Sequence, residues 1–265
     1  MTHVTSAIIV GGGIGGAATA LSLARQGIKV MLLEKAHEIG EIGAGIQLGP
    51  NAFSALDSLG VGDVARQRAV FTDHITMMDA VNAEEVVCIE TGQAFRDHFG
   101  GPYAVIHRVD IHATVWEAVL THPGVEYRTS THIVDIRQTP DDVTVFDEQG
   151  NSWTADILVG DAAHPVAQYM AQGACMALED AVTLGKALER CDGDAQQAFA
   201  LYESVRIPRT ARIVWSTREM GRLYHAAGVE RQVRNLLWKG KSQEAFYRGI
   251  EWLYGWKEDN CLEPR

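Results

Sequence analysis

Three glycines and a glutamate near the N-terminus have the types and spacing of a nucleotide-binding turn. Gly11, Gly13 and Gly16 stand in a G-x-G-x-x-G pattern, and Glu34 follows them. In this pattern the first glycine permits a tight turn, the second lets a pyrophosphate approach the backbone, and the third lets a helix pack closely on a strand. The carboxylate of Glu34 could accept both hydroxyls of an adenosine ribose. These residues predict dinucleotide binding.

The flanking sequence predicts the elements that would position these residues. An apolar run at 7–10 predicts a buried strand, 14–26 predicts a helix, and 29–33 predicts a second strand. The N–H groups at the start of that helix would face an anion. An ordinary glycine-rich turn is the alternative, but it leaves Glu34 unexplained. Residues 7–24 are uncharged over the length of a membrane span, yet they hold five glycines and no Lys or Arg precedes them, so we expect neither a signal peptide nor a membrane helix.

The composition narrows the class of protein. The chain has 265 residues, 46% of them hydrophobic, which is enough for one large domain or two small ones. Its net charge of -11 argues against general binding to nucleic acid. The four cysteines have no metal-like spacing, so we expect reduced thiols, a cytoplasmic protein and no metal site.

The middle of the chain contains further candidates. The glycines of residues 42–51 predict a loop where the backbone can approach a flat ligand, with a plain surface loop as the alternative. Arg108 stands just before a helix for which Asp110 is a plausible N-cap. His107 and His112 have no evident partners, so we assign them no function. Strands are predicted at 126–128 and 133–137, and within 70–90, and a hairpin is predicted from 143–147 and 152–159.

A second small-residue turn follows the strand that ends near residue 160. Its sequence leads into a helix predicted from Gly173 to about Arg190. The N-terminus of that helix would point at an electron-rich group, as in the opening segment. Asp161 could bind a ribose or ribityl hydroxyl or could cap the turn, and the residues alone do not separate the two.

The C-terminal part of the sequence predicts helices. Residues 195–224 are expected to be helical with an interruption at Pro208. Arg206, Arg209 and Arg212 share one face, for which a solvated or salt-bridged surface is the default expectation. The aromatic-rich tail after Arg231 predicts either docking on the body of the protein or a subunit contact in a homodimer.

Two distant segments together resemble the single-component FAD-dependent aromatic hydroxylases, the class A flavoprotein monooxygenases. They are the glycine turn with Glu34, and GDAAHP…QGACMALEDA at 160–181. Arg108, in HRVDIHATV, stands where that family has a flavin-contacting arginine. The resemblance implies a three-layer α/β fold with a Rossmann-like FAD-binding domain at 1–190 and a helical C-terminal segment at 191–265.

The resemblance also implies roles for individual residues. The implied FAD-contacting residues are Gly11, Gly13, Ile14, Gly15, Gly16, Glu34, Lys35, Gly45, Gln47, Arg108, Ile133, Asp161 and Gly173. Pro165 and Gln168 would line the substrate side, where many relatives have a second proline instead of Gln168. The implied reaction uses NADH or NADPH and O2 to hydroxylate a hydroxybenzoate, with 3-hydroxybenzoate to gentisate favoured and salicylate as the nearest competing substrate.

The sequence departs from the family pattern at one place. In the family, the strand matching 155–159 continues into an Ala-Asp-Gly motif and a long substrate-binding sheet before a second strand ends in Leu-Val-Gly-Asp. Here Val159 and Gly160 run directly into Asp161, so the segment between the two strands is absent at the 160/161 junction. We therefore expect an incomplete parallel sheet and a flavin pocket open to water on one side.

Three functional hypotheses follow. The first is an active FAD-dependent hydroxylase. The second is a truncated, non-catalytic FAD-binding remnant that at most oxidises NADH to give hydrogen peroxide. The third is an NAD-dependent enzyme with the same fingerprint, against which the elements at 160–165 and 172–174 argue, because a simple NAD-binding fold does not need them.

Overall fold

A parallel β-sheet organises the first of two lobes of the molecule. The computed structural model describes residues 3–38, 43–160 and 166–263. Within them the sheet has the strand order β12–β1–β2–β8 and continuous parallel register. Its strands are β1 (Ser6–Val10), β2 (Lys29–Leu33), β8 (Val125–Arg128) and β12 (Ile157–Gly160). The predicted opening strands are confirmed, and successive apolar residues in them, Ile8 and Ile9 in β1 and Leu32 and Leu33 in β2, are buried on both faces of the sheet.

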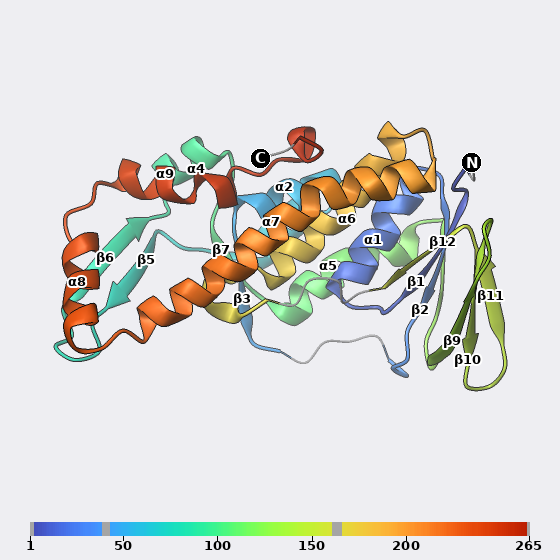
Figure 1. The fold of residues 1–265 in the computed structure, drawn as a ribbon, viewed down its shortest axis with the longest axis horizontal. Coiled ribbons are helices and arrows are strands. Elements are labelled where there is room, and N and C mark those ends of the chain that lie inside the picture. The colour runs from blue at the N-terminus through green and yellow to red at the C-terminus, as the bar shows by residue number, and fades with distance from the viewer. Residues whose placement is uncertain (1–2, 39–42, 161–165, 264–265) are drawn as a thin grey trace.

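Helices cover one face of this sheet and a second sheet covers the other (Figure 1). The helices are α1 (Ile14–Ala24), α5 (Arg108–Thr121) and α6 (Gly173–Arg190). The second sheet is antiparallel and consists of β9 (Ile133–Gln138), β10 (Val143–Asp147) and β11 (Ser152–Ala155). A cluster of buried residues, among them Ile8, Leu33 and Val145, joins the two sheets. The three-layer α/β fold is thus confirmed.

The predicted strand at 152–159 divides into two strands that belong to different sheets. β11 pairs with β10, whereas β12 pairs with β1 at the edge of the parallel sheet. The division falls at Asp156, whose carboxylate accepts hydrogen bonds from the backbone N–H and hydroxyl groups of both Thr5 and Ser6, at 2.7–3.0 Å. Apolar alternation alone could not reveal this break, because its cause lies about 150 residues away along the chain.

A second lobe contains short strands and helices. Residues 42–51 were predicted as a loop, but 45–48 form a strand that pairs with the strand at Ala104–His107, so that prediction is wrong for these residues. The glycine content predicted a loop, whereas backbone pairing with 104–107, which is distant in the sequence, makes these residues a strand. The elements of this lobe are β3 (Gly45–Leu48), α2 (Pro50–Ser58), α3 (Gly62–Arg68), β4 (Val70–Phe71), β5 (His74–Met78), β6 (Glu85–Glu90), α4 (Gln93–Phe99) and β7 (Ala104–His107).

A long helix connects the two lobes. The C-terminal elements are α7 (Ala195–Tyr224), α8 (Gly228–Trp238) and α9 (Gln243–Tyr254), and the short 3₁₀ helices are η1 (Gln168–Met170) and η2 (Glu258–Asn260). The α7 helix runs from beside α6 to the β5–β6 hairpin (Figure 1). It continues through Pro208, contrary to prediction. Arginines on both sides of Pro208 pair with α6, and these contacts hold the helix in place across the missing backbone hydrogen bond.

The aromatic tail docks on the body of the protein, which is one of the two arrangements predicted for it. Tyr247 and Tyr254 of α9 pack edge-on against Phe95 in a buried aromatic cluster. Trp256 is buried in the main core. Among the described residues, no helix is long and apolar enough to cross a membrane.

Candidate functional site

The glycine turn between β1 and α1 has the geometry that its spacing predicts. Gly11 has φ 112°, a value that favours glycine, and its N–H donates to Leu33 O on the neighbouring strand. A Cβ on Gly16 would lie 2.0 Å from Gly11 O, so the helix and the turn touch backbone to backbone. Gly13 is the N-cap of α1, and no described side chain caps this helix. The turn therefore presents helical N–H groups to an anion.

His112 of α5 supports this turn from behind, which sequence reasoning missed. Its side chain is buried, and its Nε2 lies 2.7 Å from Gly12 O, to which it donates. The only signal in the sequence was its place on the same face as Ile111 and Val115. The N-cap of α5 is His107, whose Nδ1 accepts from Val109 N–H, so the prediction of Asp110 as the cap is wrong and Arg108 is the first helical residue.

Glu34 lies directly after β2, beside the glycine turn. Its Oε2 accepts from Gly12 N–H at 2.6 Å, and its Oε1 accepts from Ala36 N–H at 2.7 Å. The carboxylate is thus held at the carboxyl end of the sheet, where open α/β sheets bind ligands. Lys35 follows it and is exposed.

A cavity of about 680 Å³ brings together residues from four distant parts of the sequence. It opens between the glycine turn, β3, the start of α5 and the N-terminus of α6. Eight of the predicted site residues line it: Gly13, Ile14, Gly15, Gly45, Gln47, Arg108, Gln168 and Gly173. Its volume falls within the range of about 300–1,000 Å³ that is typical of ligand sites.

The remaining predicted residues lie elsewhere. Gly11, Gly16, Glu34, Lys35 and Ile133 do not line the cavity, although Ile133 packs against the cluster that contains Leu33, beside Glu34. Asp161 and Pro165 lie outside the described residues. Among the described residues, no group of three or more His, Cys, Asp or Glu side chains could hold a metal ion.

The N-terminus of α6 forms one wall of this cavity. Gly173, Ala174 and Ala177 line it, and their small side chains leave the first turn accessible. The N-cap residue Gln172 does not cap the helix with its side chain. That side chain turns into the protein, where it accepts from Asn51 Nδ2 at 3.0 Å. The partial positive charge of the helix end is therefore directed into the cavity.

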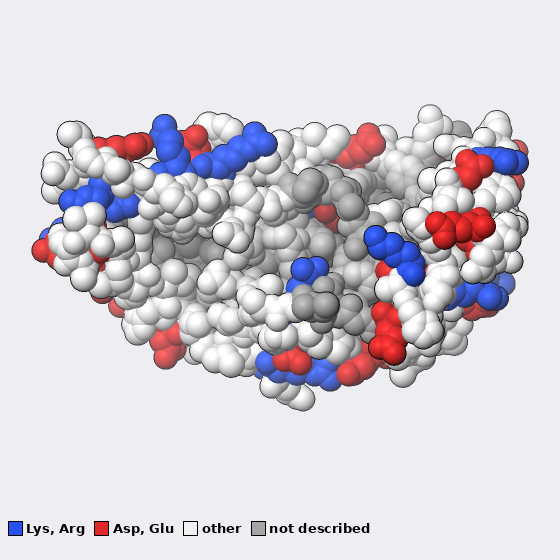
Figure 2. Space-filling view, turned by 90° about the horizontal axis from the view of Figure 1, so that it is seen from below, with Lys and Arg blue, Asp and Glu red and all other residues white. Residues whose placement is uncertain are grey.

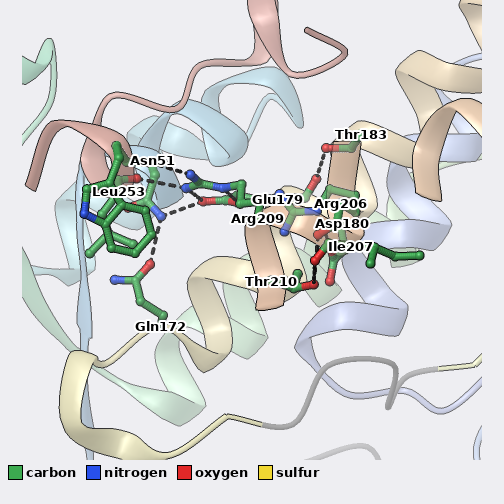
Figure 3. A network of polar contacts seen from close by, with 11 residues as sticks. Asn51, Gln172, Glu179, Asp180, Thr183, Arg206, Ile207, Arg209, Thr210 and Leu253 are labelled. Carbon is green, nitrogen blue, oxygen red and sulfur yellow. Dashed lines mark hydrogen bonds and ion pairs between the residues drawn. The ribbon is translucent and has the colours of Figure 1, made fainter. Parts of the chain in front are cut away.

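Behind this wall lies a buried polar network centred on Glu179 (Figure 3). Its carboxylate accepts from Asn51 Nδ2, Arg206 Nη1 and both Nε and Nη2 of Arg209, at 2.6–2.7 Å. Arg209 also donates to the carbonyls of Trp252 and Leu253 in α9. Two members of the predicted arginine face, Arg206 and Arg209, are thus salt-bridged, and Arg206 is not on the surface, because it is 1% exposed. Arg212 is exposed, and its guanidinium lies over the Trp252 ring.

The network predicts an acid-dependent loss of stability. Burial raises the pKa of Glu179, but the charges of Arg209 and Arg206 outweigh this effect and hold the pKa at about 2, below its ordinary 4.5. A lowered pKa contributes stability that is complete above pH 4.5 and is lost as the pH falls toward 2. Ionised Glu179 should therefore steepen the decrease in the free energy of unfolding with falling pH by up to about 1.4 kcal/mol per pH unit.

Urea unfolding at several pH values between 7 and 3 would measure this loss. Glu179→Gln should remove that part of the slope, whereas Glu148→Gln, at an exposed carboxylate, should leave it unchanged. Parallel profiles for Glu179→Gln and the wild type would contradict the prediction.

Charge on the surface agrees with the composition. Among the described residues on the face in Figure 2, Lys and Arg side chains are interspersed with Asp and Glu and form no continuous basic patch.

The three layers and the glycine-lined cavity define a dinucleotide-binding α/β protein. The sequence matches the FAD binding domain family over residues 4–156. It is 61% identical to a 3-hydroxybenzoate 6-hydroxylase of Klebsiella oxytoca, in an alignment that covers 100% of both chains. A 3-hydroxybenzoate 6-hydroxylase of Aquipseudomonas alcaligenes is 31% identical over 94% of this chain and 97% of its own length. The chain therefore belongs to the FAD-dependent aromatic hydroxylases.

Solved structures agree on the fold. A salicylate hydroxylase in complex with its substrate has a TM-score of 0.76, with 16% identity, and covers 98% of this chain and 97% of its own. The p-nitrophenol 4-monooxygenase PnpA of Pseudomonas putida DLL-E4 has a TM-score of 0.82, also at 16% identity, and covers 100% of both chains. At this identity, the likeness concerns the fold alone.

The alignment with the Klebsiella protein is longer than this chain. It spans 397 positions, whereas the chain has 265 residues, so the difference consists of positions that face a gap in this chain. Gaps on this scale are consistent with an absent internal segment.

Proposed function

We propose that this chain binds FAD and acts as a monooxygenase that hydroxylates a hydroxybenzoate with NADH or NADPH and O2. The favoured reaction is 3-hydroxybenzoate to gentisate, the activity named for the relatives with high identity. The observation that carries the proposal is the cavity in which the glycine turn, Gln47, Arg108 and the α6 N-terminus meet. When bound, FAD supplies hydride acceptance and the activation of O2.

The residues of the chain fit this cofactor. The close contact of Gly16 with Gly11 brings the N-terminus of α1 to the turn, where Gly11, Gly13, Ile14 and Gly15 would bind the pyrophosphate. Glu34 would accept from the adenosine ribose, with Lys35 and Ile133 near the adenosine end.

The other residues would act around the flavin ring. Gly45 and Gln47 would lie along the ring and Arg108 would contact the cofactor. Asp161 would bind the sugar-alcohol chain. Gly173 would bring helical N–H groups to the pyrimidine edge of the flavin and stabilise negative charge there. Gln168 and Pro165 would orient the aromatic acid on the substrate side.

A second candidate function rests on the alignment gap. A chain without the substrate-binding segment would exclude water poorly, and oxidation of NADH would then yield hydrogen peroxide instead of hydroxylated product. We propose 1–190 as the FAD-binding domain, with the absent segment at 160/161, and 191–265 as the C-terminal helical segment. Four free cysteines accord with a cytoplasmic location, and a homodimer would need surfaces other than the docked aromatic tail.

The test starts with the absorption spectrum of the gel-filtered protein. Two visible bands at a near-stoichiometric ratio would support the FAD site, and a colourless protein after incubation with FAD would overturn it. NADH oxidation is then followed with 3-hydroxybenzoate, with salicylate, and with benzoate, which lacks the activating hydroxyl. Gentisate formed in proportion to NADH supports the hydroxylase, whereas hydrogen peroxide without gentisate supports the remnant.

A further inference from the structure

The cavity has two walls that come from distant parts of the chain. One wall is β3, which contributes Gly45 and Gln47, and the other is the first turn of α6, which contributes Gly173 and Ala174. The distance between these two elements sets the width of the cavity for a ligand that binds between them. Only Gly173, Ala174 and Ala177 of α6 line the second wall, so large side chains facing the ligand do not set the position of this helix.

A buried contact behind the cavity joins the two walls. Asn51 follows β3 by three residues, at the start of α2, and is fully buried. Its Nδ2 donates to Gln172 Oε1 at the N-cap of α6 and to Glu179 Oε1 about two turns further along the same helix. One amide group therefore holds the end of β3 against the first two turns of α6.

Glu179 determines how this amide is oriented. A carboxylate only accepts hydrogen bonds, so Asn51 must present its NH2 group to it, and Asn51 Oδ1 has no partner among the described residues. The carboxylate in turn is fixed by Arg206 and Arg209 of α7. Burying such a cluster is costly unless every charge is paired, so the arrangement has little freedom to shift.

Figure 3 shows the resulting chain of contacts. It runs from the α9 carbonyls through Arg209 and Glu179 to Asn51, and from there to Gln172. We propose that Asn51, Gln172 and Glu179 are positioning residues, which fix the spacing of the two cavity walls and hold the α6 N-terminus toward the flavin. The identity of the ligand in this inference rests on the proposed function.

The test compares Asn51→Leu and Glu179→Gln with Asp79→Asn. Asp79 is a matched control, because it is a buried carboxylate paired with Arg231 and Arg234 of α8, and it contacts neither α6 nor the cavity. Sulfite adds reversibly to oxidised flavin, and positive charge at the pyrimidine edge stabilises the adduct. We expect the Kd for sulfite to rise by about three- to tenfold in Asn51→Leu and to stay within about twofold of wild type in the control. Glu179→Gln also removes a buried negative charge, which by itself would strengthen sulfite binding, so this variant is compared by hydrogen exchange.

Hydrogen exchange of the apoprotein supplies a second readout that needs no flavin. Amides in the first two turns of α6 should exchange at least about tenfold faster in both network variants but not in Asp79→Asn. If the wild type binds no FAD, the proposed function fails and the exchange data alone test the positioning role. Unchanged exchange in α6, or unchanged sulfite affinity in flavin-loaded Asn51→Leu, would overturn the inference.

Discussion

Gly16→Ala is expected to abolish FAD binding and to lower the free energy of unfolding by about 3 kcal/mol or more. The added methyl would lie 2.0 Å from Gly11 O, a backbone atom that cannot rotate away. To relieve this clash, α1 must move away from the end of β1, although α1 is packed against both α5 and α6. The first-turn N–H groups would then leave the position in which they can bind a pyrophosphate.

Visible absorbance after gel filtration and urea unfolding would measure the two effects. Gly249→Ala is the matched control, since a Cβ there meets nothing within 4 Å in the interior of α9. This control should keep FAD and gain up to about 1 kcal/mol of stability, because alanine favours helix more than glycine. A yellow, stable Gly16→Ala protein would contradict the assigned turn.

Arg206→Met is expected to destabilise the protein by about 3–5 kcal/mol, the usual cost of breaking a buried ion pair from one side. Arg206 Nη1 lies 2.6 Å from Glu179 Oε2, and Nε lies 2.5 Å from Asp180 Oδ1. Methionine has about the volume of the arginine side chain, but it leaves the fully buried Glu179 with less positive charge to compensate its carboxylate. Arg206→Lys should recover only part of the loss, because an ammonium cannot reproduce the two directions of the guanidinium.

Urea unfolding with a second probe of α7 helicity would measure this effect. Arg222→Met, on the same helix, removes an exposed arginine that pairs with Glu219 and Glu230 at 3.2 and 3.7 Å. Its loss should cost less than about 1 kcal/mol. Equal losses for the two variants would show that the burial of Arg206 adds nothing to the pair.

The opening of the chain could be predicted because its signals are local. Apolar runs at 7–10 and 29–33, the glycine spacing and Glu34 each lie within a stretch of about 30 residues. Strand, turn and helix there follow from steric limits on neighbouring residues. The helix at 173–190 was predicted with the bounds observed for α6, because its apolar positions recur at helical spacing.

The residues of the cavity could be predicted in part from the family resemblance, but their arrangement in space could not. Resemblance to a family pointed to Gln47, Arg108 and Gly173 as members of one site, but only the fold brings them to one cavity. His112 escaped prediction because its partner is a backbone carbonyl 100 residues away, which no side-chain pattern announces.

By itself, the sequence determined the nucleotide-binding turn and the face shared by Arg206 and Arg209, and its resemblance to a family implied the three-layer class. The tertiary structure decided which of these polar faces is buried, where the strand breaks at Asp156, and that α7 continues through Pro208. The physical reason is the same in each case. A carboxylate or guanidinium side chain is normally exposed to solvent. Its burial becomes favourable only when elements distant in the sequence supply partners of opposite charge.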